Sequence, residues 1–139
     1  MKDRVTCFKL NWYNWGLCCA DDAVQEELAV YRNKNILVHR ELNGYGVLCS
    51  CEIIDIEQSL AEEFFEFLEK VSADWADDYS VEVCDGSAWK LRMWHSSRKV
   101  KKVCGTVRYP PHGKEIENYI RLFMENSESI IESKMFGCC

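Results

Sequence analysis

Strand-like runs of β-branched, aromatic and other apolar residues fill the first third of the chain. They cover residues 5–12, 27–32, 36–42 and 47–54, and the second of them alternates between polar and apolar positions. Short segments rich in asparagine or glycine follow the second and third runs. Because such short connections join neighbouring antiparallel strands, the pattern predicts an antiparallel meander.

The hydrophobic period changes to between three and four in two later segments. Over residues 57–75 the apolar positions fall on one stripe of a helix, and glutamates occupy the rest of its surface. This stripe consists of Leu60, Ala61, Phe64, Phe65, Leu68, Val71 and Trp75. A second stripe, formed by Ile116, Tyr119, Ile120 and Phe123, predicts another helix over residues 114–125.

Between the two helical segments the residues return to a strand pattern over 79–84, 88–94 and 100–108. The Asp-Gly pair after the first of these runs is typical of a hairpin turn. In the second run, Lys90 and Arg92 face one side of the strand while the apolar residues between them face the other.

The predicted order of elements is β-β-β-β-α-β-β-β-α. Runs of strands punctuated by single helices favour an α+β fold, with an antiparallel sheet and two main helices packed on one face. The length of 139 residues fits a single domain over residues 1–139.

Composition supports a folded chain, because 47% of the residues are hydrophobic and only two are proline. No apolar run approaches the roughly 18 residues of a membrane span. We therefore expect a soluble protein with no contact to a membrane.

Nine cysteines, an odd number, are spread along the chain. The N-terminus leads into a strand-like run and not into a signal-peptide core, so we expect a cytoplasmic protein with reduced thiols. Cys49 and Cys51 form a C-x-C pair within a strand, which matches the C-x(2–4)-C turns of zinc sites poorly. We expect small core hydrophobes, and not metal ligands, at Cys7, Cys49, Cys51, Cys84 and Cys104.

The formal net charge of −6 is an average over two segments of opposite sign. Residues 52–85 carry twelve acidic groups and one lysine, a balance of −11, whereas residues 86–114 carry eight basic groups and no acidic one. The candidate acidic surface comprises Glu62, Glu63, Glu66, Glu69, Asp74, Asp77 and Asp78. The candidate basic surface comprises Lys90, Arg92, Arg98, Lys99, Lys101, Lys102 and Arg108. An acidic helix next to basic strands would also neutralise them within the folded monomer.

Motifs of catalysis and of phosphate binding are missing from the sequence. The histidines His39, His95 and His112 have no metal-ligand spacing to one another or to a cysteine, and no P-loop, G-x-G-x-x-G or G-x-S-x-G motif occurs. We therefore assign no catalytic residue, no metal ligand and no cofactor, and expect no enzyme. A small cysteine-dependent enzyme, with Cys84 or Cys104 beside His95, stays as an alternative.

Residues 57–125 carry a local pattern of their own. A helix ending in a tryptophan is followed by D-G-x-x-W-x-L over 85–91 and by G-x-x-x-Y-P over 105–110. This pattern resembles small uncharacterised bacterial α+β proteins, and some similar acidic proteins are immunity proteins of toxin systems. The resemblance implies a fold and a cytoplasmic location, and it carries no catalytic residue.

The sequence thus favours a cytoplasmic bacterial binding protein. In its most concrete form it is an immunity protein that neutralises a basic toxin domain through protein–protein contact with the acidic surface. The alternative is a module that binds single-stranded nucleic acid through the basic hairpin over 86–114, with Trp89, Trp94 and Tyr109 stacking on bases. Trp89 faces the same side of its strand as the core-like residues Leu91 and Met93, however, so nucleic acid is the less expected partner.

Overall fold

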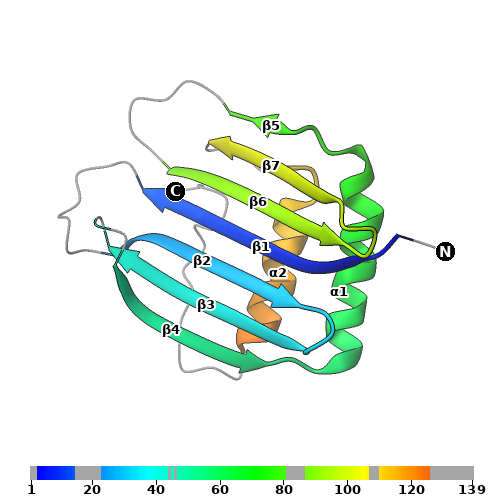
Figure 1. Cartoon of the computed structure of the whole chain (residues 1–139), viewed down its shortest axis with the longest axis horizontal. Helices are drawn as coiled ribbons and strands as arrows, with labels where there is room; N and C mark the ends of the chain where they lie inside the picture. Colours follow the sequence, from blue (N-terminus) through cyan, green and yellow to red (C-terminus); the bar gives the residue numbers. More distant parts are fainter. Residues whose placement is uncertain are drawn as a thin grey trace.

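The computed structural model describes residues 3–14, 23–43, 45, 47–80, 87–106 and 110–125, which form a seven-stranded sheet with two helices against it (Figure 1). The strands are β1 (Val5–Asn14), β2 (Ala23–Tyr31), β3 (Ile36–Asn43), β4 (Leu48–Asp55), β5 (Asp78–Tyr79), β6 (Ser87–His95) and β7 (Val100–Thr106). The helices are α1 (Gln58–Val71), the short 3-10 helix η1 (Ser72–Asp74) and α2 (Gly113–Met124). The predicted α+β class and the predicted order of elements are confirmed.

The first strand of the chain lies at the centre of the sheet. The order is β4-β3-β2-β1-β6-β7-β5, and every neighbouring pair is antiparallel except β5 with β7. Strands β1 to β4 each pair with the next, so the predicted meander is confirmed.

Strand β5 departs from the prediction. A strand was expected over 79–84, but β5 covers only Asp78–Tyr79, and residues 81–86 with the Asp-Gly turn lie outside the described residues. β5 runs parallel to β7 and forms no hairpin with β6. The reason is topological, because β6 already has β1 and β7 as neighbours and offers no free edge.

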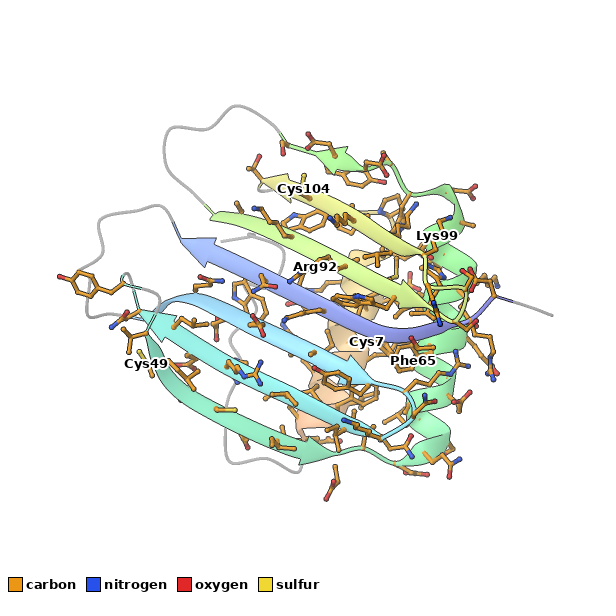
Figure 2. The ribbon with its side chains drawn as sticks, viewed as in Figure 1. Cys7, Cys49, Phe65, Arg92, Lys99 and Cys104 are labelled. Atoms are coloured by element: carbon orange, nitrogen blue, oxygen red, sulfur yellow. The ribbon has the colours of Figure 1, made fainter. Side chains whose placement is uncertain are left out.

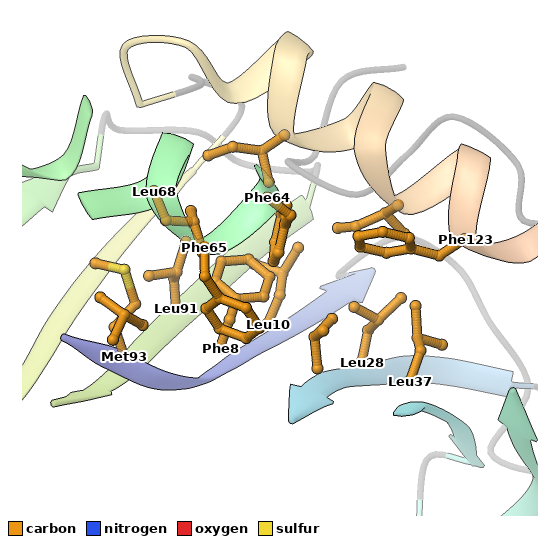
Figure 3. Close-up of a cluster of buried hydrophobic side chains, with 14 of the residues drawn as sticks. Phe8, Leu10, Leu28, Leu37, Phe64, Phe65, Leu68, Leu91, Met93 and Phe123 are labelled. Carbon is orange, nitrogen blue, oxygen red and sulfur yellow. The ribbon is translucent and has the colours of Figure 1, made fainter. Parts of the chain in front are cut away.

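Both helices lie behind the sheet in the view of Figure 1, on one of its faces. Alternate residues of the central strands point toward them and join the helix stripes in one hydrophobic cluster (Figure 3). Phe64 of α1 is at its centre, in edge-to-face contact with Phe8 of β1 at 5.5 Å and with Phe123 of α2 at 5.2 Å between ring centroids. Burial of each such ring stabilises the fold by about 1.5–3 kcal/mol.

Gly105 of β7 lets the indole ring of Trp89 lie flat against the backbone. A β-carbon at this position would come within 2.6 Å of Cζ2 of Trp89. Trp89 is fully buried and stacks on Tyr79 at 6.3 Å. The glycine of the G-x-x-x-Y-P pattern is therefore a packing requirement of the core tryptophan.

A buried arginine fastens α1 to the sheet. Arg32, directly after β2, donates two hydrogen bonds to the Glu62 carboxylate, at 3.0 and 2.7 Å, and one to Glu69 at 3.2 Å. The same guanidinium donates to the Val5 carbonyl at 2.9 Å and lies over the Phe65 ring at 5.4 Å. Glu62 and Glu69 of α1 therefore stabilise the packing of the helix on the sheet.

Candidate functional site on the open face of the sheet

The side of the sheet turned away from α1 and α2, here called the open face, carries a distinct set of residues. They alternate with the core residues along each strand, and Figure 2 views them from the front. Its central members are Lys9, Asn11, Glu27, Ala29, Val38, Arg40, Cys51, Ile53, Lys90, Arg92, Lys102 and Cys104. No described helix covers this face.

Three cations form one row across the middle of the open face. Arg92 of β6 is the direct partner of Lys9 on β1 and of Lys102 on β7. Like charges placed directly opposite one another destabilise a sheet. The row therefore favours an anionic group above it.

The row is only partly neutralised. Lys9 donates to Glu27 at 3.1 Å, whereas neither Arg92 nor Lys102 forms an ion pair among the described residues. Arg92 instead lies over the ring of Trp94, at 5.4 Å from its centroid. Two positive charges on neighbouring strands therefore remain without a carboxylate partner in the described part of the chain.

Glu27 organises the neighbouring row. Its carboxylate accepts hydrogen bonds from Asn11 at 3.0 Å and from Arg40 at 3.0 Å, in addition to the lysine contact. Burial acts to raise the pKa of Glu27, but hydrogen bonds from Asn11, Lys9 and Arg40 outweigh it and hold that pKa below its ordinary value. Glu27 is thus a fixed anion that positions Lys9 and Arg40.

A hollow of about 650 Å³ lies on this part of the sheet. Side chains of opposite character line it, among them Asn11, Glu27, Asp77, Lys90, Arg92 and Lys102. A concave surface with several convergent polar groups is the usual form of a binding site.

The structure separates the seven residues of the predicted basic surface. Lys90, Arg92 and Lys102 gather on the open face. Lys101 points the other way and donates to the Trp75 carbonyl at 3.3 Å. Arg98 and Lys99 are exposed in the turn between β6 and β7, where Figure 2 labels Lys99, and Arg108 lies outside the described residues. Sequence reasoning missed Lys9, since only the strand order brings β1 beside β6.

Of the three aromatic residues proposed for base stacking, the two that the structure describes do not share a face of the sheet. Trp89 belongs to the core on the helix side, and Tyr109 lies outside the described residues. Trp94 is on the open face but half-buried, with Arg92 over its ring.

Of the seven residues of the predicted acidic surface, Asp77 lines the hollow on the open face, and the glutamates of α1 lie elsewhere. Hydrogen bonds from Arg32 hold the pKa of Glu62 below its ordinary value, with further support from the charge of Arg4. Glu69 also binds Arg32, and Glu63 accepts from the Tyr119 hydroxyl at 3.0 Å. All three belong to α1, on the far side of the sheet from Arg92, so α1 does not neutralise the open face as the sequence suggested.

The remaining members of the acidic surface are exposed. Glu66 lies on α1 and Asp74 in η1. Asp77 and Asp78 lie beside β7, where the Asp78 carboxylate accepts the Ser80 backbone N–H at 2.7 Å. The seven acidic residues are therefore spread from α1 to the β5 edge of the sheet.

The prediction of core cysteines is wrong for Cys49 and Cys51, which are exposed on the edge strand β4. Cys7 and Cys104 are half-buried on the open face, and Cys84 lies outside the described residues. The side chains of the four described cysteines point away from the helices because each of them alternates along its strand with a residue that faces the helices.

The half-buried thiols are not activated. Burial raises the pKa of Cys7 to about 11, despite the opposing charges of Lys9 and Arg92. Burial and the charge of Asp78 raise the pKa of Cys104. His95 lies five positions along β6 from Lys90, the partner of Cys104, a distance of about 16 Å. The structure therefore does not bring the proposed Cys104–His95 pair together.

Sequence reasoning assigned no metal ligand, but the structure brings Glu26, His39 and Glu41 together on the helix side of the sheet. The spacing rules search for pairs of histidine or cysteine close in sequence, and these three residues meet only through strand pairing.

The described part of the chain contains no helix of the length and apolar character that a membrane span requires. Comparison of the chain with family models, with curated proteins and with solved structures found no match. The resemblance to small bacterial α+β and immunity proteins therefore stays a prediction.

Proposed function

We propose that this protein acts by binding, without catalysis, and that the open face of its sheet holds an acidic protein partner. The observation that carries this proposal is the cation row of Lys9, Arg92 and Lys102 beside the hollow. Arg92 and Lys102 face it without a carboxylate partner among the described residues.

The composition of the open face favours a protein partner over a nucleic acid. The line of paired residues that contains the cation row continues across β2, β3 and β4 as Ala29, Val38 and Ile53. Ala29 and Val38 are buried, whereas Ile53 is 66% exposed. An exposed isoleucine in line with charged residues suits a protein–protein interface, which combines apolar and polar contacts. A site for single-stranded nucleic acid needs accessible aromatic faces, and Arg92 occupies the face of Trp94.

Neutralisation of a toxin is one concrete form of such binding. The open face would bind an acidic toxin surface, and the exposed residues Glu66 and Asp74 would bind a basic one. We place the protein in the cytoplasm, because exposed neighbouring thiols at Cys49 and Cys51 suit a reducing compartment.

A charge-reversal experiment tests the open face. The variant Arg92→Glu with Lys102→Glu reverses the two unpaired cations, and the control Lys70→Glu with Lys99→Glu makes the same charge change at exposed sites elsewhere. Binding of a fluorescent poly-glutamate peptide and of an oligothymidylate is measured by anisotropy at about 50 mM salt. We expect the first variant, and not the control, to bind poly-glutamate about tenfold or more weakly.

The two probes separate the two classes of partner. Preference for the oligothymidylate, with loss of that binding in Arg92→Glu with Lys102→Glu, would replace the protein partner by a nucleic acid. Equal poly-glutamate binding by the two charge-reversed variants would remove the open face as the site.

A further inference from the structure

A polar cluster interrupts the side of the sheet that faces the helices. Glu26 of β2, and His39 and Glu41 of β3, lie there, because they alternate in phase with the core residues Leu28 and Leu37. They lie toward the end of β2 and β3 that extends beyond α2 in Figure 1. The cluster is on the opposite side of the sheet from the open face, so it is independent of the proposed function.

The three side chains converge on one point. Glu26 and Glu41 are direct partners across β2 and β3, and Nε2 of His39 lies 3.2 Å from Oε1 of Glu26. One donor atom of each residue lies within 4.8 Å of the other two. Donor atoms that share one ion at about 2.0–2.2 Å stand roughly 3–4 Å apart, so small side-chain rotations suffice. We propose that Glu26, His39 and Glu41 bind a divalent transition-metal ion.

Charge favours a cation at this point. Two carboxylates directly opposite one another repel, and the side chains of His39 and Glu26 are only 6% and 29% exposed, which limits screening by water. A divalent ion between the carboxylates removes the repulsion, and coordination by Nε2 of His39 then replaces its contact with Glu26.

Trp12 supplies an independent sign of a ligand. It stands directly opposite Glu26 across β1 and β2, and its ring lies parallel to that of His39, at 11° and 6.5 Å between centroids. Trp12 is 2% exposed, yet its indole N–H has no hydrogen-bond partner in the part of the chain that the structure describes. A buried N–H of this kind is costly and can only donate, so an acceptor with a lone pair, such as a metal-bound water, would satisfy it.

The donor set selects the class of metal. Imidazole suits zinc, iron, copper and nickel, whereas calcium and magnesium prefer oxygen ligands alone. Carboxylates additionally suit manganese. One histidine and two glutamates therefore fit a divalent ion of the manganese-to-zinc series, with water in the remaining positions.

Manganese is the probe of choice, because the nine thiols of this chain compete for zinc but bind the harder Mn²⁺ weakly. The full chain is titrated with Mn²⁺, and free ion is measured by its electron paramagnetic resonance signal. In parallel, paramagnetic broadening of the indole N–H signals is followed by NMR. The variants are His39→Gln, Glu41→Gln and, as matched control, His112→Gln, whose ring pairs with Glu115 at 3.1 Å and has no third donor beside it among the described residues.

We expect one equivalent of Mn²⁺ to bind and to broaden the Trp12 signal first. Glu41→Gln and His39→Gln should weaken binding about tenfold or more, since loss of even an outer partner of a metal ligand costs that much, while His112→Gln should not. Thermal melts without metal establish that each variant is folded, and the half-buried position of Glu41 makes Glu41→Gln the safer of the two. Failure to bind Mn²⁺ at millimolar concentration, or equal binding by wild type and Glu41→Gln, overturns the site.

Discussion

The buried guanidinium of Arg32 forms a two-bond pair with the carboxylate of Glu62, from Nε to Oε1 at 3.0 Å and from Nη2 to Oε2 at 2.7 Å. This geometry is the strongest that an arginine and a carboxylate can adopt. It joins the end of β2 to the second turn of α1, so the helix that looked like a docking surface is partly a structural partner of the sheet.

Removal of Arg32 should destabilise the protein strongly. Arg32→Met takes a donor from the Val5 carbonyl and from Glu69, which then relies on the longer contact from the Val5 N–H at 3.4 Å, and loss of one partner of a buried pair costs about 3–5 kcal/mol. Because the Glu62 side chain is 37% exposed, we expect about 2–4 kcal/mol in urea unfolding. Arg4→Met is the matched control, since Arg4 binds the same carboxylate at 3.1 Å from an exposed position and should cost at most about 1 kcal/mol. Similar losses in the two variants would contradict the role of burial.

The same pair should make stability depend on pH. Arg32 lowers the pKa of Glu62 in the folded state, so this carboxylate stabilises the fold above its unfolded pKa, near 4.5, and loses that contribution as the pH falls through the lower folded value. The difference in unfolding free energy between wild type and Glu62→Gln should therefore be full at neutral pH and shrink below about pH 4.5. Glu66→Gln, at an exposed site on the same helix, is the matched control for the loss of one carboxylate from α1. A constant difference between wild type and Glu62→Gln from neutral pH to pH 3 would rule out the linkage.

Substitution of Gly105 should destabilise the fold, and the overlap with Trp89 should account for the loss. The β-carbon of Gly105→Ala would overlap the indole ring, and overpacking of this kind costs about 1–3 kcal/mol. In a Trp89→Leu background, which removes the ring, the same substitution should cost clearly less. A double-mutant cycle by urea unfolding measures the coupling, and strictly additive losses would show that the glycine serves another purpose.

Most of the fold follows from local patterns. The alternation around residues 27–42 and the helical stripe around Phe64 and Phe65 predict strands and a helix that the structure contains with shifts of a few residues. These signals are local, because the hydrophobic period is read within one element. The placement of β5 does not follow from a local pattern, since it depends on which strand edge is free after β6 has paired with β1.

The candidate sites depend on register, which sequence reasoning used only in part. The turn between β2 and β3 makes Tyr31 and Ile36 partners, and counting outward from it places Glu26 opposite Glu41. This inference needs only the position of the turn, so the sequence alone could have predicted that Glu26 lies opposite Glu41. The pairing of Lys9 with Arg92 could not be predicted in this way, because β1 and β6 are far apart in the chain.

Thiol reactivity should divide the described cysteines into two groups. Cys49 and Cys51 are exposed, whereas Cys7 is half-buried with a pKa of about 11, so its thiolate is scarce at pH 8. Timed alkylation with iodoacetamide, read by peptide mass spectrometry, should modify Cys49 and Cys51 well before Cys7. Denatured protein is the control, in which the three rates should converge. Equally fast modification of Cys7 in the folded protein would contradict its burial on the open face.

The cation row should lower the free energy of unfolding of the free protein and strengthen the binding of an acidic partner. Lys102→Gln removes one of two like charges that flank Arg92 across the strands, and relief of such repulsion should stabilise the free protein by about 0.2–1 kcal/mol. The gain should shrink at high salt, because Lys102 is exposed and its field is screened. Urea unfolding at low and high salt measures both effects.

Lys99→Gln is the matched control for this prediction, since it removes the same charge from an exposed position in the turn between β6 and β7. A stabilisation common to both variants would reflect the net charge of the chain and not the row. Stabilisation confined to Lys102→Gln, together with weaker binding of poly-glutamate, would mean that the fold maintains an electrostatic cost on the open face that a bound acidic partner relieves. A residue that reduces stability yet improves binding is best explained by a role in recognition.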